Sequence, residues 1–205
     1  MLPRLAIEIP ESGRLDPRML FGDKQPRIWL EIGFGGGEHL AFQAGRHPET
    51  GFIGCEVFEN GIVSLLAHIE RRNLANIRIF ADDARLLIAA LPSGSVARVF
   101  VLFPDPWPKR RHHKRRIVSR ETLDRLAEIM ADDAELRLAT DETDHLCWML
   151  GHLTDHPGFE WLARRPLDWR ERPRDWPSTR YEERARLAER SPVFLRARRR
   201  PRFAG

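Results

Sequence analysis

Short apolar runs alternate with amphipathic stretches along most of the chain. The apolar runs predict strands over 27–32, 51–55, 77–80, 97–103, 135–140, 159–162 and 193–198. The stretches between them predict helices over 38–46, 58–72, 84–91, 120–130 and 143–154. Repeated strand–helix units are typical of an α/β fold in which a mostly parallel sheet carries helices on both faces.

Such a sheet binds ligands beyond the carboxyl ends of its strands, so the residues that follow each strand are the candidate site. Glycines that include Gly33 and Gly35 follow the first strand, and they allow the backbone to turn sharply beside a ligand. Three carboxylates, Glu31, Glu56 and Asp83, end or follow the first three strands. The position of Glu56 suits ribose hydroxyls, and that of Asp83 suits an adenine amine.

The charge of this region bears on which ligand fits. Glu31 and Glu38 flank the glycine turn, and their carboxylates would repel a pyrophosphate. The pattern therefore disfavours a nicotinamide dinucleotide. It favours S-adenosylmethionine, which combines an adenosine, a sulfonium cation and an amino-acid tail without phosphate.

A stiff acidic turn follows the fourth and most apolar strand. Asp105 lies between two prolines, which restrict the backbone and pre-aim the carboxylate, and Trp107 offers an aromatic face to a base. Residues 109–116 follow directly and contain six Lys or Arg and two His. We expect this segment to bind phosphates, and the candidate contacts besides Lys109 are Arg111, Lys114, Arg115 and Arg116. An acidic, aromatic turn beside a polycation indicates an enzyme that acts on nucleic acid.

Length and charge complete the outline of the chain. Its 205 residues suffice for a single domain, which we place over 1–205 with a short N-terminal arm at 1–26 and a basic C-terminal tail at 196–205. The formal charge is only +4, although residues 109–116 alone carry six basic side chains and no acidic ones. The basic excess is therefore concentrated in 109–116 and in the C-terminal arginines. Basic charge distributed in this way favours an anionic partner.

Other classes are disfavoured. Cys55 and Cys147 have no metal-ligand spacing and form no disulfide framework, and His112 and His113 have no companion ligands nearby, so we expect no metal. No apolar run is long enough to span a membrane, and the first residues do not resemble a signal peptide. We therefore expect a cytoplasmic protein with no membrane partner. The sequence does not indicate the oligomeric state.

A series of motifs between about residues 27 and 182 resembles the bacterial tRNA (guanine-N7)-methyltransferases. The motifs are Glu31-Ile-Gly-Phe-Gly-Gly-Gly37, Gly54-Cys-Glu56, Phe103-Pro-Asp-Pro-Trp-Pro-Lys109, Lys114-Arg-Arg116, Ala139-Thr-Asp141 and Thr179-Arg-Tyr-Glu182. The Pro-Asp-Pro-Trp-x-Lys element is the most specific of them. The resemblance implies a Rossmann-like, seven-stranded methyltransferase fold with one antiparallel strand. It also implies S-adenosylmethionine as methyl donor and guanosine 46, in the variable loop of tRNA, as acceptor.

The resemblance also implies roles for individual residues. Glu31, Gly33, Gly35, Glu56, Asp83 and Asp105 would bind the donor, and Asp105 would be the catalytic residue. Lys109, Asp141, Thr179, Arg180, Tyr181 and Glu182 would contact the substrate, with 179–182 in a loop that returns to the active site. Read without the resemblance, residues 182–189 predict the surface of an ordinary helix.

The chemistry of the acceptor restricts what Asp105 can do. Guanine N7 carries a lone pair and no proton, so its methylation needs no general base. We expect Asp105 to orient guanine and to stabilise the positive charge of the methylated ring, without abstracting a proton. Two alternatives stay open: a methyltransferase that acts on another RNA base position, and a non-catalytic RNA-binding Rossmann module.

Overall fold

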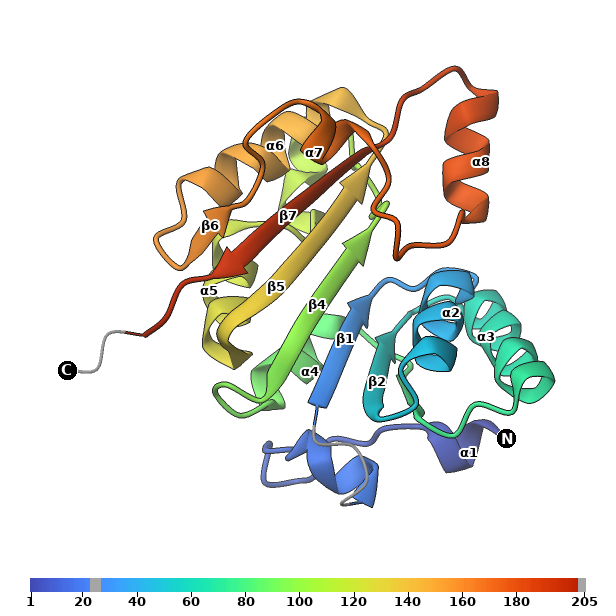
Figure 1. Cartoon of the computed structure of the whole chain (residues 1–205). Helices are drawn as coiled ribbons and strands as arrows, with labels where there is room; N and C mark the ends of the chain where they lie inside the picture. Colours follow the sequence, from blue (N-terminus) through green and yellow to red (C-terminus); the bar gives the residue numbers. More distant parts are fainter. Residues whose placement is uncertain (23–26, 203–205) are drawn as a thin grey trace.

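The computed structural model describes residues 1–22 and 27–202, which form one seven-stranded sheet with helices on both faces (Figure 1). The strand order is β3-β2-β1-β4-β5-β7-β6. The strands are β1 (Arg27–Ile32), β2 (Thr50–Cys55), β3 (Ile77–Phe80), β4 (Val96–Leu102), β5 (Met130–Thr140), β6 (Phe159–Trp161) and β7 (Val193–Arg199). β7 runs antiparallel to both of its neighbours, and the other pairs are parallel. The predicted fold class is therefore confirmed.

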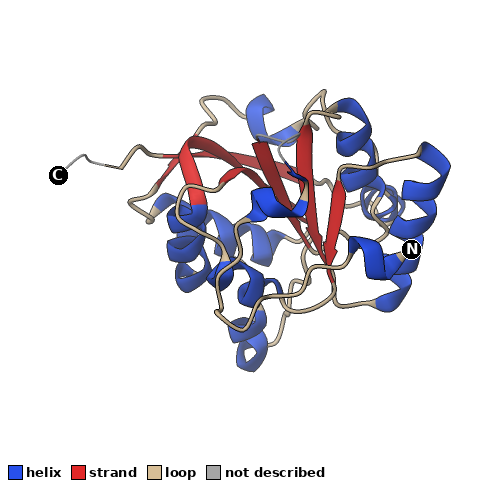
Figure 2. Cartoon of the chain, turned by 90° about the horizontal axis from the view of Figure 1, so that it is seen from below, coloured by secondary structure: helices blue, strands red, loops and turns tan. Residues whose placement is uncertain are grey.

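Helices cover the two faces of the sheet (Figure 2). The helices predicted from the sequence are α2 (Glu38–Arg46), α3 (Glu59–Arg72), α4 (Ala84–Ala90), α5 (Arg120–Ile129) and α6 (Thr143–Thr154). Buried side chains of α2 and α3 belong to one hydrophobic cluster, and those of α4, α5 and α6 belong to another. Each cluster buries one face of the sheet, which explains why the central strands are apolar on both sides.

The predicted N-terminal arm packs against the sheet. It contains α1 (Leu2–Leu5), a bridge between Ala6 and Ile79, and the 3₁₀ helix η1 (Pro17–Leu20). Ile7, Leu15 and Phe21 are buried in the core. These contacts make the described part of the arm integral to the fold, while residues 23–26 lie outside the described residues.

The predicted C-terminal tail is wrong at its start, because Arg196–Arg199 form the last residues of β7. Leu195 and Ala197 are buried in the core. Arg196 and Arg198 alternate with them and therefore occupy outward positions of the strand. Residues 203–205 lie outside the described residues.

The C-terminal arginines are also engaged within the protein. Arg196 pairs with Glu135, Arg198 with Glu160, and both Arg199 and Arg202 with Asp132. Arg202 and Arg199 further donate to carbonyls at the C-terminus of α5, where cations are favourable. These four arginines therefore have acidic partners within the protein, although Arg199 and Arg202 share one of them.

Besides the short helices of the N-terminal arm, the 3₁₀ helix η3 (Arg110–Arg115) and α7 (Leu167–Arg170) were not predicted. α8 (Arg180–Leu187) overlaps the helix that residues 182–189 predict when they are read without the resemblance. α8 lies near the carboxyl ends of the central strands (Figure 1). Among the described residues, no helix is long and apolar enough to cross a membrane.

Candidate active site

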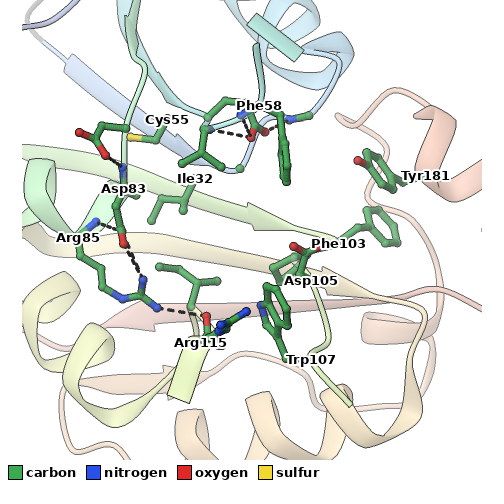
Figure 3. Close-up of a pocket in the computed structure, with 18 residues that line it drawn as sticks. Ile32, Cys55, Phe58, Asp83, Arg85, Phe103, Asp105, Trp107, Arg115 and Tyr181 are labelled. Atoms are coloured by element: carbon green, nitrogen blue, oxygen red, sulfur yellow. Dashed lines mark hydrogen bonds and ion pairs between the residues drawn. The ribbon is translucent and has the colours of Figure 1, made fainter. Parts of the chain in front are cut away.

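A pocket of about 320 Å³ opens at the carboxyl ends of β1, β2, β3 and β4 (Figure 3). Its walls come from the residues that end or follow these four strands and from one residue of α8. They are Ile32, Gly33, Gly35, Cys55, Glu56, Val57, Phe58, Asp82, Asp83, Ala84, Arg85, Phe103, Pro104, Asp105, Trp107, Arg115, Ile117 and Tyr181. The pocket thus occupies the edge where an open α/β sheet binds its ligands.

The glycine turn forms one wall. Gly35 has a φ of +54°, and a Cβ at this position would lie 2.9 Å from the Tyr181 ring. A side chain there would strain the backbone and also meet Tyr181, so the turn requires glycine.

Glu56 joins the glycine turn to the end of β2. Its Oε2 accepts from the Gly35 amide at 2.8 Å, and its Oε1 accepts from the amides of Val57 and Phe58 at 2.8 and 3.1 Å. The carboxylate is buried and lines the pocket. Backbone donors therefore hold it in place, and an acceptor-only group of this kind suits hydroxyl donors of a ligand.

Asp83 lies on the opposite wall, at the start of α4. It caps the helix by accepting from the Arg85 amide at 2.9 Å, and it also pairs with the Arg85 side chain at 3.0 Å. Arg85 Nη2 donates to the carbonyl oxygen of Arg115 at 3.2 Å (Figure 3). Arg85 thereby links the Asp83 wall to the basic segment.

Cys55 also lines the pocket, and its thiol is buried. Burial, followed by the neighbouring Glu56 and Asp83 carboxylates, raises the pKa of this thiol strongly. The group is therefore a neutral wall of the pocket and not a thiolate nucleophile.

Glu31 is not among the residues that line the pocket. Its carboxylate is 3% exposed and lies 2.7 Å from Nδ1 of His39. Successive residues of a strand point to opposite faces, so Ile32 reaches the pocket while Glu31 faces α2. Gln43 continues this buried network by donating to the Asp175 carbonyl at 2.7 Å. The contact of Glu31 with S-adenosylmethionine stays a prediction. The burial of Glu31 beside His39 does not favour it.

The acidic turn after β4 forms the third wall. Asp105 is exposed and lines the pocket together with Phe103 and Trp107. Phe103 and Trp107, on either side of Asp105, have positive φ values of 51° and 41°. Such angles are costly for non-glycine residues and indicate a turn that its surroundings hold in place. The Arg115 guanidinium lies 4.9 Å from the centre of the Trp107 ring.

The basic segment follows the turn as η3. Lys109, Arg111, Lys114 and Arg115 are exposed, which is compatible with the predicted phosphate contacts. Arg116 differs, because it is only 1% exposed and its Nε donates to the Pro106 carbonyl at 2.8 Å. This burial does not favour the predicted phosphate contact by Arg116, which stays a prediction.

The predicted substrate residues 179–182 begin a helix and do not form a loop. The Thr179 side chain caps α8 by accepting from the Glu182 amide at 3.3 Å. Arg180 pairs with Glu38 at 2.6 Å, and Tyr181 reaches the pocket wall. The remaining predicted substrate residue, Asp141, pairs with Arg190 at 3.0 Å and does not line the pocket.

A second cleft of about 320 Å³ lies on the other side of α8. Four arginines line it together with Glu182 and Glu183; they are Arg170, Arg172, Arg186 and Arg190. Burial raises the pKa of the Glu182 carboxyl, although Arg172 lies 3.5 Å away and opposes the shift. Arg172 and Arg190 pair with acids, so among the described residues Arg170 and Arg186 carry the basic charge of this cleft.

The structure thus brings seven predicted residues together around one pocket: Gly33, Gly35, Glu56, Asp83, Asp105, Arg115 and Tyr181. Lining residues that sequence reasoning missed include Val57, Phe58 and Arg85. Val57 and Phe58 are large, apolar and exposed, at 58% and 65%, directly after Glu56. Two apolar residues directly after a carboxylate at a strand end could have indicated that Val57 and Phe58 line the pocket. Nothing in the sequence distinguished Arg85 from other surface arginines. Among the described residues, no group of three or more His, Cys, Asp or Glu side chains could hold a metal ion.

Comparisons with known proteins agree with this geometry. A family model described as "Putative methyltransferase" matches residues 25–195. The tRNA (guanine-N(7)-)-methyltransferase of Rhodospirillum rubrum is 51% identical over 207 residues, which cover 100% of this chain and 81% of that protein. The enzyme of the same name from Paramagnetospirillum magneticum is 51% identical over 204 residues, covering 98% of this chain and 85% of that protein.

Solved structures share the fold at low sequence identity. The 16S rRNA methyltransferase KamB has a TM-score of 0.61 at 15% identity and covers 95% of this chain and 96% of its own. An rRNA methylase from Streptococcus thermophilus has a TM-score of 0.58 at 13% identity and covers 93% of this chain and 95% of its own. The family model and the two relatives at 51% identity show that the chain belongs to the tRNA (guanine-N(7)-)-methyltransferase family.

Proposed function

We propose that this protein transfers a methyl group from S-adenosylmethionine to N7 of the guanosine at position 46, in the variable loop of tRNA. The observation that carries the proposal is that the Asp105 turn and the carboxylates Glu56 and Asp83 share one pocket. The relatives of highest identity quoted above are named for the same reaction. The proposal assigns the donor to the Glu56 and Asp83 walls and the acceptor base to the Asp105 wall.

The donor side of the pocket fits S-adenosylmethionine by its chemistry. Glu56 would accept from ribose hydroxyls, and Asp83 would accept from the adenine amine. Phe58 is an exposed apolar neighbour for the adenine ring. When bound, S-adenosylmethionine supplies an electrophilic methyl group on a sulfonium cation, and the pocket carboxylates suit that positive charge better than a phosphate.

The acceptor side needs alignment more than proton transfer. N7 of guanine attacks the methyl carbon with its lone pair, the bond from that carbon to sulfur breaks, and no proton leaves N7. Asp105 would accept hydrogen bonds from N1 and N2 of guanine, which selects guanine over adenine. It would also stabilise the positive charge that the ring gains on methylation. The main catalytic contribution is therefore the positioning of two reactants by a stiff turn.

Two basic surfaces flank the pocket and would hold the tRNA backbone. One is the exposed part of the basic segment, at Lys109, Arg111, Lys114 and Arg115. The other is the arginine-lined cleft beside α8. Contacts from both would fix the register of the RNA while Asp105 selects the base.

The test is incubation with labelled S-adenosylmethionine and unmodified tRNA, followed by nucleoside analysis by mass spectrometry. The proposal predicts labelled N7-methylguanosine. A methyl group on an exocyclic amine would instead support an enzyme for another base position. A protein that binds tRNA but not the donor in calorimetry would be a non-catalytic module. If the donor binds as proposed, Glu56→Ala abolishes binding, whereas Glu59→Ala, an exposed carboxylate outside the pocket, retains it.

A further inference from the structure

Arg116 lies inside the protein although it ends the most basic segment of the chain. Its side chain is 1% exposed, the lowest value among the charged residues of the core. The Nε atom donates to the Pro106 carbonyl at 2.8 Å, and Nη2 lies 3.4 Å from the Trp107 carbonyl. The guanidinium therefore binds the backbone of the turn that carries Asp105.

The other side of the guanidinium is held by α6. Nη2 also donates to the Asp144 carboxylate, and the guanidinium carbon lies 4.9 Å from the centre of the Trp148 ring. Trp148 is itself fixed, because its indole N–H donates to the Val118 carbonyl at 2.6 Å. Arg116 thus connects the acidic turn to a packed helix of the fold.

The turn has little other support of this kind. Pro104, Pro106 and Pro108 have no amide hydrogen, so they cannot donate to neighbouring carbonyls. Among the described residues, the hydrogen bonds to the Pro106 and Trp107 carbonyls come from Arg116. Because Trp107 has a positive φ, the turn needs external contacts to keep its shape.

We infer that Arg116 is a positioning residue that holds the Asp105 turn in its working geometry, and that it does not contact tRNA phosphate. This inference rests on the proposed function of the pocket. A planar guanidinium can reach two carbonyls and a carboxylate at once, which a lysine ammonium on a flexible stem cannot reproduce. An error of about 1 Å in the alignment of reactants can cost roughly 100-fold in rate.

The test compares Arg116→Lys and Arg116→Met with the wild type in turnover at saturating tRNA, KM for tRNA, donor affinity and melting temperature. We expect kcat to fall by roughly 100-fold in both variants, while KM for tRNA and donor affinity stay within about twofold of wild type. The slope of log affinity for tRNA against log salt should also be unchanged. The matched control is Arg198→Ala, which removes an arginine that pairs with Glu160 away from the pocket and should change none of these values.

The opposite pattern would overturn the inference. If Arg116 held a phosphate, Arg116→Met would reduce the salt slope by about 1 and leave kcat unchanged. A kcat close to wild type in folded Arg116→Lys would also contradict a positioning role. If Arg116→Met fails to fold, the same measurements on Arg116→Lys and Asp144→Asn decide the question. Asp144 is exposed, and its replacement releases only one side of the guanidinium. Wild-type protein that forms no N7-methylguanosine would refute the proposed function itself, separately from these outcomes.

Discussion

The amide of Gly35 donates a hydrogen bond to Oε2 of Glu56 at 2.8 Å. This bond ties the turn after β1 to the carboxylate after β2, so the two neighbouring strands form one continuous wall of the pocket. The shape of the glycine turn and the position of Glu56 therefore depend on each other.

Gly35→Ala should disrupt this wall. A methyl group there would lie 2.9 Å from the Tyr181 ring on a backbone with positive φ, so we expect weaker donor binding, by at least tenfold in calorimetry, and a lower melting temperature. Gly94→Ala is the matched control, since Gly94 has a φ of +69° and open space around its Cβ position. Both variants should lose about 1–2 kcal/mol to backbone strain. Equal donor affinity in the two variants would argue against the role of the turn.

Asp105→Asn tests the electrostatic role of the acidic turn. The amide preserves the shape of the side chain but removes its charge, so it cannot stabilise the cationic ring. We expect turnover to fall by about 100-fold or more, without recovery at high pH. The measurement is the dependence of kcat on pH for both proteins. A loss of turnover that high pH relieves, because hydroxide replaces the lost base, would indicate a general base instead.

The exposed arginines and lysine of the basic segment should account for much of the salt dependence of tRNA binding. Neutralising Arg111, Lys114 and Arg115 together should weaken binding and lower the salt slope by about one for each phosphate that the protein no longer binds. A triple substitution of Arg196, Arg198 and Arg202 removes as much charge, but these arginines are paired with acids within the protein. Binding titrations across a salt series should show a larger change in slope for the first triple, and equal slopes would refute the assignment.

His145 predicts a dependence of stability on pH. The side chain is fully buried and neither ring nitrogen has a hydrogen-bond partner among the described residues. Burial, with a smaller effect of Arg116, lowers the pKa of His145 to about 4. In the unfolded chain the ring gains its proton near pH 6.5, so the unfolded state binds more protons between pH 6.5 and 4 and stability falls as pH decreases through this window.

Chemical denaturation at a series of pH values measures this effect. His145→Phe should flatten the decline in the free energy of unfolding between pH 6.5 and 4, by up to about 1.4 kcal/mol per pH unit. A slope unaffected by His145→Phe would show that the decline comes from other groups.

Much of the fold follows from local patterns in the sequence. β1 and β3 have the predicted bounds because a short, mostly apolar run ends before Gly33 in β1 and shortly before Asp82 in β3. β5 begins earlier than predicted, at Met130, because Asp132 and Asp133 interrupt its apolar pattern. Asp133 has a φ of 63°, and the pairing of β5 with β4 shifts register across this segment. The start of α8 could also be predicted from the sequence, because Thr179 and Glu182 have the spacing of a capping box.

The site was predictable from the fold pattern mainly where it depends on strand ends. Glu56, Asp83 and Asp105 each follow a strand, and the parallel sheet brings them to one edge. The burial of Arg116 could not be read from its neighbours, because its partners are backbone carbonyls and an aspartate 28 residues away. The pairing of the C-terminal arginines depends in the same way on acids of β5 and β6 that are distant in the sequence.

The central claim is that N7 of a tRNA guanosine attacks a methyl group aligned by the Asp105 turn. The most direct test uses two tRNA transcripts of one sequence, one made with guanosine and one with 7-deazaguanosine, in which carbon replaces N7. With labelled S-adenosylmethionine, the guanosine transcript should accept one methyl group per molecule and the 7-deazaguanosine transcript none, while both bind with similar affinity. Equal methylation of the two transcripts would contradict the account, because it would place the acceptor at another atom.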